Sequence, residues 1–158
     1  MAQIKTNAMR ILDAKKVDYE MLTYDNKDGK IDGISVAEKI GKNPKEVYKT
    51  LVVQGARKNI VVFVIPVAEE LDLKKAAKAA GEKSVEMLPM KDIQKWTGYI
   101  RGGCSPIGMK KEYRTFLDES SRSLETIVVS AGKIGVQMVL TPANLLEVTK
   151  AEFYSVTK

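Results

Sequence analysis

The chain has 158 residues, of which 44% are hydrophobic, and its 26 basic and 20 acidic side chains give a formal net charge of +6. This length suffices to bury a hydrophobic core, so we expect one domain over residues 1–158. The positive net charge is consistent with a polyanionic partner and equally with an ordinary solvated surface. The sequence contains no histidine, which excludes Ser-His-Asp and Cys-His nucleophiles, imidazole bases and histidine-containing zinc sites.

Hydrophobic spacing and turn-forming residues divide the first half of the chain into short helices followed by strands. They predict a helix from about Ile4 that ends before Val17, an extended segment at 19–24, a loop at 25–33, a helix at 35–40, a helical turn after Asn43, and strands at 47–54 and 59–66. The last two are β-branched and joined by Gly55-Ala56-Arg57-Lys58, which is typical of a hairpin in the middle of a sheet.

The second half of the chain also combines predicted helices and strands. We expect a helix from Asp72 to Ala80, a strand at 84–87, a helix at 89–97, strands at 112–117, 126–130 and 135–140, a helix from Thr141 to about Lys150, and a strand at 152–156. Gly98–Gly108 holds too many glycines for either regular element and predicts a shaped loop. Because several strands follow one another without a helix between them, the order favours an α+β fold with a mixed, largely antiparallel sheet or partial barrel surrounded by helices.

The cysteine content and the N-terminus bear on the compartment. Cys104 is the single cysteine, and no apolar stretch of signal-peptide type opens the sequence, which predicts a cytoplasmic protein. The most apolar run, residues 60–68, is far too short to cross a bilayer and contains Pro66. We therefore expect no membrane association.

Lys49 is the sharpest candidate for a functional residue. It lies in the predicted strand 47–54, where Val47, Leu51 and Val53 share its alternation and are apolar. A cation on the apolar face of a central strand is costly unless a partner or a ligand compensates it. The simpler alternative is a lysine at a sheet edge whose ammonium group reaches water.

Two further segments combine glycine, small hydroxyls and a cation: the loop from Gly98 to Gly108, and Ser130-Ala131-Gly132-Lys133. Glycines can adopt positive φ and aim backbone amides at a carbonyl oxygen or a phosphate, although an ordinary turn uses the same residues. Cys104 lies in the first segment. Without a histidine to activate it, we expect its thiol to pack against neighbours rather than act as a nucleophile.

Four blocks of sequence together carry a resemblance to a known family: YKTLVV, LDLKKAAKAAGEKSVEM, TGYIRGGCSPIGMKK and VVSAGKIG. Over nearly the whole chain the sequence resembles the YbaK/EbsC family of bacterial Cys-tRNA(Pro) deacylases, within the prolyl-tRNA synthetase editing-domain superfamily. The resemblance implies a YbaK-like aminoacyl-tRNA editing fold and removal of cysteine from mischarged tRNA, with no cofactor and no metal. It also implies two partners, the acceptor end of mischarged tRNA and, in a transient complex, prolyl-tRNA synthetase.

The resemblance also assigns site residues. Those expected to take part in catalysis are Lys49, Gly102 and Ser130, and those expected to bind substrate are Tyr24, Thr50, Gly103, Ser105 and Gly132. In this scheme the glycine loop holds the aminoacyl carbonyl or amine, and Lys49 orients the terminal phosphate or ribose and offsets developing negative charge. Two departures are visible: Ala131 replaces a glycine of the family's turn, and Gln137 stands where some relatives carry an acidic residue.

The implied chemistry suits a chain without histidine. An aminoacyl ester is already activated, and in relatives that clear cysteine the resemblance implies that the substrate's own thiol attacks the ester carbonyl. Two alternatives stay open: deacylation of another mischarged tRNA, such as alanyl-tRNA, with water as the attacking group, and a tRNA-binding module without catalysis. Lys110-Lys111 is a candidate contact to phosphate.

Overall fold

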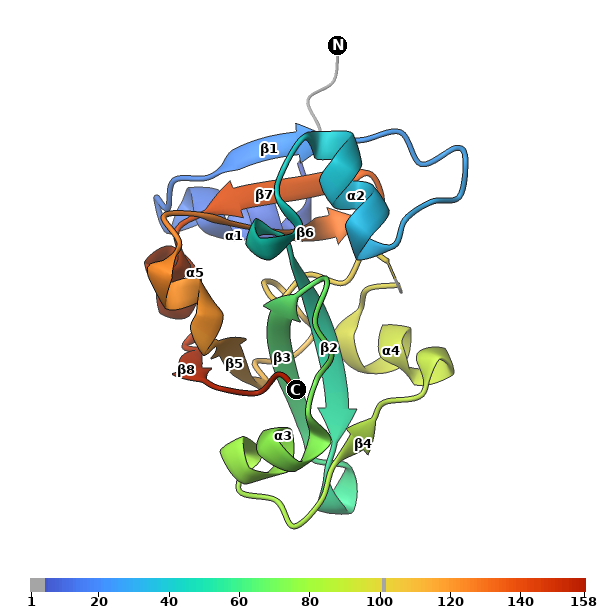
Figure 1. Cartoon of the computed structure of the whole chain (residues 1–158), viewed down its shortest axis with the longest axis vertical. Helices are drawn as coiled ribbons and strands as arrows, with labels where there is room; N and C mark the ends of the chain where they lie inside the picture. The colour runs from blue at the N-terminus through green and yellow to red at the C-terminus, as the bar shows by residue number, and fades with distance from the viewer. Residues whose placement is uncertain (1–4, 101) are drawn as a thin grey trace.

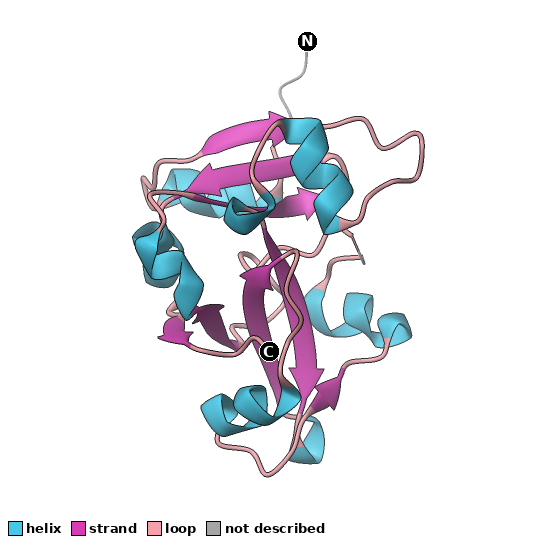
Figure 2. Ribbon diagram, in the orientation of Figure 1, coloured by secondary structure: helices cyan, strands magenta, loops and turns pink. Residues whose placement is uncertain are grey.

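The computed structural model describes residues 5–100 and 102–158 and arranges them as two β-sheets with helices around them (Figures 1 and 2). The helices are α1 (Asn7–Ala14), α2 (Gly33–Ile40), α3 (Leu73–Ala80), α4 (Met90–Thr97) and α5 (Pro142–Thr149), with 3-10 turns η1 (Pro44–Glu46), η2 (Ala56–Lys58) and η3 (Glu119–Ser123). The strands are β1 (Glu20–Thr23), β2 (Tyr48–Gln54), β3 (Ile60–Pro66), β4 (Glu86–Met87), β5 (Arg114–Asp118), β6 (Ile127–Lys133), β7 (Val136–Leu140) and β8 (Glu152–Tyr154).

The smaller sheet has the strand order β1-β7-β6 and is antiparallel, and the larger sheet has the order β4-β2-β3-β5-β8. In the larger sheet β2 pairs antiparallel with β3 and β4, whereas β3 with β5 and β5 with β8 are parallel pairs. The expected α+β class with mixed, largely antiparallel pairing is confirmed. The strands form two sheets, and neither closes into a barrel.

The start of β2 connects the two sheets. Val47, directly before β2, forms a parallel bridge to Val128 of β6, and its carbonyl accepts a hydrogen bond of 2.9 Å from the amide of Val67. These three valines are buried in one cluster with Ala37 of α2. The first residues of β2 therefore lie where the upper and lower sheets of Figure 1 meet.

Local capping interactions set the helix boundaries, largely as predicted. The carboxylates of Asp32 and Asp72 accept hydrogen bonds from amides in the first turns of α2 and α3, and Gly41 and Gly98 end α2 and α4 in the left-handed conformation. Ile4, where the first helix was expected to begin, lies outside the described residues. None of the helices in the described part of the chain has the length and hydrophobicity that crossing a bilayer requires.

Several boundaries differ from the prediction by two or three residues: α2 begins at Gly33, β4 is only Glu86–Met87, β5 begins at Arg114 and β8 ends at Tyr154. Strand β6 continues to Lys133 instead of ending at Ser130, because a bulge between these two residues shifts the register of its pairing with β7. The turn η3 was not predicted. Asp118, 3% exposed, anchors it: the two carboxylate oxygens accept hydrogen bonds from the amides of Ser120 (3.2 Å) and Val156 (3.1 Å).

Candidate active site at the junction of the sheets

A cavity of about 380 Å³ lies at the junction of the two sheets. Five of the eight residues predicted from the sequence line it: Tyr24, Lys49, Thr50, Gly102 and Ser130. They come from the end of β1, the start of β2, the glycine-rich loop and β6, segments that are far apart in the sequence. Further parts of the wall are Ile31, Asp32, Cys104 and Gln137.

The other three predicted residues hold the loop and the turn in shape rather than facing the cavity. Gly103 donates its amide hydrogen to the carbonyl of Ile100 at 3.0 Å. Ser105 is fully buried, and its hydroxyl accepts a hydrogen bond of 3.2 Å from the amide two residues later. Gly132 has a φ of +100° and donates its amide hydrogen to the hydroxyl of Ser130 at 3.2 Å.

Lys49 is half-buried on the cavity wall and pairs with Ile65 of β3. Burial lowers the pKa of its ammonium group below the ordinary value of 10.5, and the negative charges of Glu70 and Glu69 oppose this shift only in part. Among the described residues, no carboxylate lies within 4.0 Å of its nitrogen. Lys49 therefore provides the cavity with a partly desolvated cation that can interact with an anionic or carbonyl-bearing ligand.

Two hydroxyl groups of the cavity residues are buried and have no hydrogen-bond partner within the described structure, namely Tyr24 Oη and Thr50 Oγ1. An unsatisfied buried polar group costs about 1–3 kcal/mol, and native proteins contain few of them. Both belong to the residues predicted to bind substrate. Their unused hydrogen-bonding capacity is suited to a polar ligand.

Strands β6 and β7 contribute a second polar pair. Ser130 and Gln137 are opposite each other in the antiparallel ladder, and Gln137 is also paired with Leu22 of β1. The Ser130 oxygen accepts the amide of Gly132, which leaves its own hydrogen available to donate. Gln137 is 5% exposed and presents a neutral amide at this wall. The sequence marked Gln137 as a departure from relatives but not as part of the site.

Cys104 lines the cavity without the properties of a nucleophile. Burial raises the pKa of its thiol to about 11, so the reactive thiolate is scarce at neutral pH. The side chain packs against the apolar cluster formed by Val52, Ile60 and Leu88. This placement agrees with the expected packing role.

Sequence reasoning missed the residue that fixes the loop over the cavity. The ammonium group of Lys39 donates to the carbonyls of Asp25 (2.8 Å) and Lys30 (3.0 Å) and to the carboxylate of Asp28 (2.7 Å), and it lies 5.8 Å from the centre of the Tyr24 ring. The hydrogen bond from Lys39 lowers the pKa of the Asp28 carboxyl. Because two of these partners are backbone carbonyls, the sequence carries no signal for the contact.

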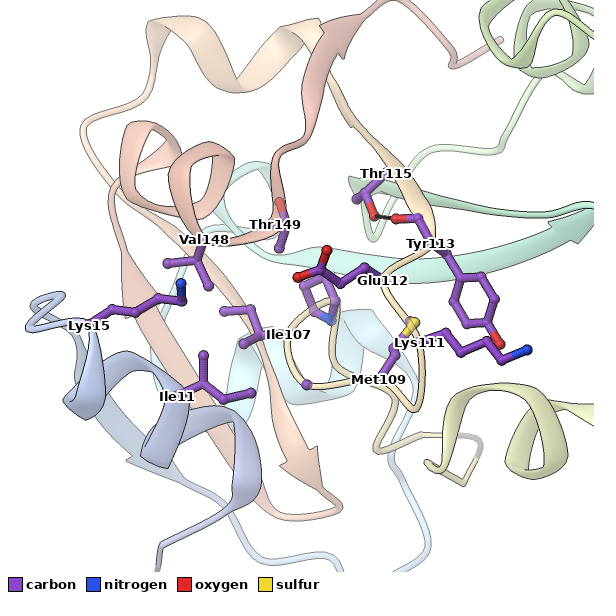
Figure 3. Close-up of a pocket in the computed structure, with 12 residues that line it drawn as sticks. Ile11, Lys15, Ile107, Met109, Lys111, Glu112, Tyr113, Thr115, Val148 and Thr149 are labelled. Atoms are coloured by element: carbon purple, nitrogen blue, oxygen red, sulfur yellow. Dashed lines mark hydrogen bonds between the residues drawn. The ribbon is translucent and has the colours of Figure 1, made fainter.

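A second hollow of about 220 Å³ is lined by another stretch of the same loop together with α1 and α5 (Figure 3). Its threonines are satisfied internally: Thr115 donates to the carbonyl of Tyr113 at 3.0 Å, and Thr149 to the carbonyl of Leu145 at 2.7 Å. None of the eight predicted residues is among those that line it. Over residues 5–100 and 102–158, no three cysteine or acidic side chains gather closely enough to hold a metal ion.

Comparisons with known proteins decide the family. Residues 33–148 match the family model of the aminoacyl-tRNA editing domain. The chain belongs to the aminoacyl-tRNA editing domain family. This editing domain is 48% identical over 155 residues to a protein of Enterococcus faecalis (strain ATCC 700802 / V583) whose provisional name is Cys-tRNA(Pro)/Cys-tRNA(Cys) deacylase EbsC; the match covers 98% of this chain and 94% of that protein.

Two other proteins extend the comparison. A proline–tRNA ligase of Brachyspira hyodysenteriae (strain ATCC 49526 / WA1) is 28% identical over 89 residues, which cover 56% of the editing domain chain and 15% of the ligase. A solved structure described, also provisionally, as a trans-editing enzyme for prolyl tRNA synthetase superposes with a TM-score of 0.84 at 20% identity, covering 99% of each chain. The family resemblance and the editing fold are thus confirmed, and editing of mischarged tRNA follows from the family.

Proposed function

We propose that this editing domain acts in trans to remove cysteine from mischarged Cys-tRNA(Pro). One observation carries most weight: the half-buried Lys49 lines a cavity together with Tyr24 and Thr50, whose buried hydroxyls have no partner among the described residues, and the chain has no histidine. Such a site can position and polarise a polar guest but has no activated nucleophile of its own. The name of the Enterococcus faecalis relative supports cysteine as the amino acid removed.

The attacking group is then the thiol of the substrate. The cysteinyl sulfur forms a bond to the ester carbonyl carbon, the bond from that carbon to the ribose oxygen breaks, and the thiol proton ends on the released ribose hydroxyl. The products are free tRNA and a cyclic thioester of cysteine, which water opens. A thiol is partly ionised near neutral pH and is intrinsically nucleophilic, so alignment within the cavity supplies most of the rate.

The cavity residues have distinct roles in this scheme. Lys49 offsets the negative charge that develops on the carbonyl oxygen, and the backbone at Gly102 lies beside the aminoacyl group. The hydroxyls of Tyr24, Thr50 and Ser130 bind the substrate amine and the ribose hydroxyl. Gln137, being neutral, adds no negative charge to the cavity that it lines together with Lys49.

The need for such an enzyme follows from a limit on binding. A synthetase pocket that accepts proline cannot strongly exclude amino acids of similar or smaller volume, because one methylene group is worth only about 1–3 kcal/mol of discrimination. A second site must then remove the wrong product. In this proposal a transient complex with prolyl-tRNA synthetase delivers the mischarged tRNA, in line with the description of the solved structure with the same fold.

A panel of esters tests the proposal. We expect cysteine to leave tRNA(Pro) at least about tenfold faster than without enzyme, whereas seryl-tRNA(Pro), which differs only in oxygen for sulfur, is lost at the uncatalysed rate. Rapid loss of serine and alanine would show that water attacks and would overturn the thiol mechanism. Salt-sensitive tRNA binding with no ester loss at all would show a binding module instead.

A further inference from the structure

The loop between β1 and α2, residues 24–32, forms one side of the cavity. Figure 1 shows it as a long excursion that leaves the end of β1 and returns at the start of α2. Tyr24 at one end of the loop and Ile31 and Asp32 at the other line the cavity, whereas residues 25–30 do not. The placement of the loop therefore sets two parts of the cavity wall.

The middle of this loop, residues 25–30, is shaped by local hydrogen bonds. The amide of Lys27 donates to the carboxylate of Asp25 at 2.9 Å, and the amide of Lys30 donates to the carboxylate of Asp28 at 3.0 Å. Each bond joins residues two positions apart and closes a turn of the Asx type. Such turns fix the local path of the chain but do not attach it to the neighbouring helix or sheet.

Lys39 of α2 supplies the attachment. Its side chain is 21% exposed, and its ammonium group donates three hydrogen bonds, to the carbonyl of Asp25, the carboxylate of Asp28 and the carbonyl of Lys30. An ammonium group has three protons, so its donor capacity is used completely. One cation therefore holds both turns of the loop against the helix that follows them.

The same ammonium group also faces the ring of Tyr24. It lies 5.8 Å from the ring centre, within the range of a cation–π contact. The Tyr24 backbone is fixed by its amide, which donates to the carbonyl of Gly135 at 3.0 Å. The hydroxyl at the far end of the ring is buried and has no hydrogen-bond partner within residues 5–100 and 102–158. The ring is thus anchored at its backbone and held by Lys39, while its hydroxyl stays available for a ligand.

We propose that Lys39 is a positioning residue, which holds the Tyr24 ring so that its hydroxyl is in place before the substrate binds. This inference rests on the proposed function, in which that hydroxyl binds a polar group of the substrate. Lys39 itself is not among the residues that line the cavity, so it acts through the loop and the ring. Groups that are ordered in advance lose less conformational entropy on binding, so the effect should fall on substrate affinity and not on the chemical step.

Steady-state kinetics on Cys-tRNA(Pro) test the proposal. Lys39→Met should raise KM about fivefold and change kcat by less than about twofold, and Lys39→Arg, which keeps a cation beside the ring, should raise KM less. The matched control is Lys27→Met, which removes the same charge from an exposed side chain of the same loop. In a Tyr24→Phe background, Lys39→Met should have almost no further effect on KM, because the hydroxyl that Lys39 positions is gone. An equal rise in KM in both backgrounds, or the same rise in the control, would overturn the proposal.

NMR of the free protein with labelled tyrosine rings gives a test that needs no catalysis. The Tyr24 signals are assigned from their loss in Tyr24→Phe. We expect them to shift in Lys39→Met, because the ammonium group leaves the ring face, and to stay in place in Lys27→Met. Unchanged Tyr24 signals in Lys39→Met would overturn the proposal. A wild-type protein that removes no cysteine from tRNA would refute the proposed function instead, and the spectra would still decide whether Lys39 holds the ring.

Discussion

The ring of Tyr99 occupies the space that a side chain at Gly132 would need: a β-carbon there would lie 2.7 Å from Tyr99 Cε1. The Tyr99 hydroxyl also donates a hydrogen bond of 2.6 Å to the carbonyl of Ile107. One aromatic side chain therefore spans the glycine-rich loop and touches the bulge of β6. The positions of Gly102 and Ser130, which belong to that loop and to β6, depend on this contact.

Gly132→Ala should disrupt the site as well as the fold. The new methyl group would collide with Tyr99, and the φ of +100° is unfavourable for any residue with a β-carbon, so we expect about 2–3 kcal/mol less stability in urea unfolding and loss of most deacylation activity. Gly41→Ala is the matched control, because Gly41 also has a positive φ, +70°, but nothing within 4 Å. If both variants lose the same stability and keep activity, Tyr99 does not couple the loop to the bulge of β6.

Lys49→Met should make the protein more stable and inactive. Burial lowers the pKa of Lys49 in the folded state, so folding disfavours its charged form. That penalty is fully present below the lowered pKa, fades as pH rises from there toward the unfolded value of 10.5, and is absent above it. We expect a gain in stability near neutral pH, no gain above pH 10.5, and a deacylation rate lower by about a hundredfold or more.

Urea unfolding at pH 7 and at alkaline pH, with a deacylation assay, measures both effects. Lys45→Met in η1 is the control, since Lys45 is exposed and lies outside the cavity. A stable variant with full activity would remove Lys49 from the mechanism. A destabilised variant would mean that its ammonium group has a compensating partner in the fold.

Tyr24→Phe separates stability from substrate binding. The Tyr24 hydroxyl is buried and has no partner in the part of the chain that the structure describes. Its removal should therefore leave stability unchanged or raise it by up to about 1 kcal/mol, while KM for the cysteinyl ester rises about tenfold. Tyr113→Phe should behave oppositely, because that hydroxyl donates a 2.6 Å hydrogen bond to the carbonyl of Trp96 and lies outside the cavity. Parallel thermal unfolding and Michaelis–Menten measurements distinguish them. A Tyr24→Phe protein with normal KM would show that this hydroxyl does not meet the substrate.

Local signals in the sequence predicted much of the fold but not its long-range contacts. The β2–β3 hairpin and the helix ends at Asp72 and Gly98 follow from residue type and spacing, which act within a few residues. The division into two sheets depends on the bridge from Val47 to Val128, which no local pattern specifies.

The candidate site divides in the same way. Lys49 is recognisable as a charge in an apolar strand. Ser130 drew attention only as part of a segment that combines a hydroxyl, a glycine and a cation, and Tyr24 entered only through the family resemblance, since a tyrosine is ordinary in such a position. Ser105 belongs to the same motif as Gly102, yet it is buried and bonded to the loop backbone. A motif conveys which residues occur together but not which of them face the cavity. The contacts of Lys39 could not be predicted from the sequence, because most of its hydrogen bonds are to backbone carbonyls.

Cys104→Ala should leave the deacylation rate within about threefold of the wild type, because the attacking sulfur belongs to the substrate. In the folded protein burial raises the pKa of the Cys104 thiol from 9.0 to about 11. At pH 7.5 alkylation of Cys104 by iodoacetamide should therefore be slow in the folded state and fast in urea, and the thiol should need no protection for the protein to stay active.

The raised pKa of Cys104 makes wild-type stability fall as pH rises from 9 toward 11, because the unfolded thiol ionises there and the folded one does not. Cys104→Ala should remove that decline. If instead Cys104→Ala is inactive while Lys49→Ala still deacylates, the protein uses its own thiol and the substrate-thiol mechanism is wrong.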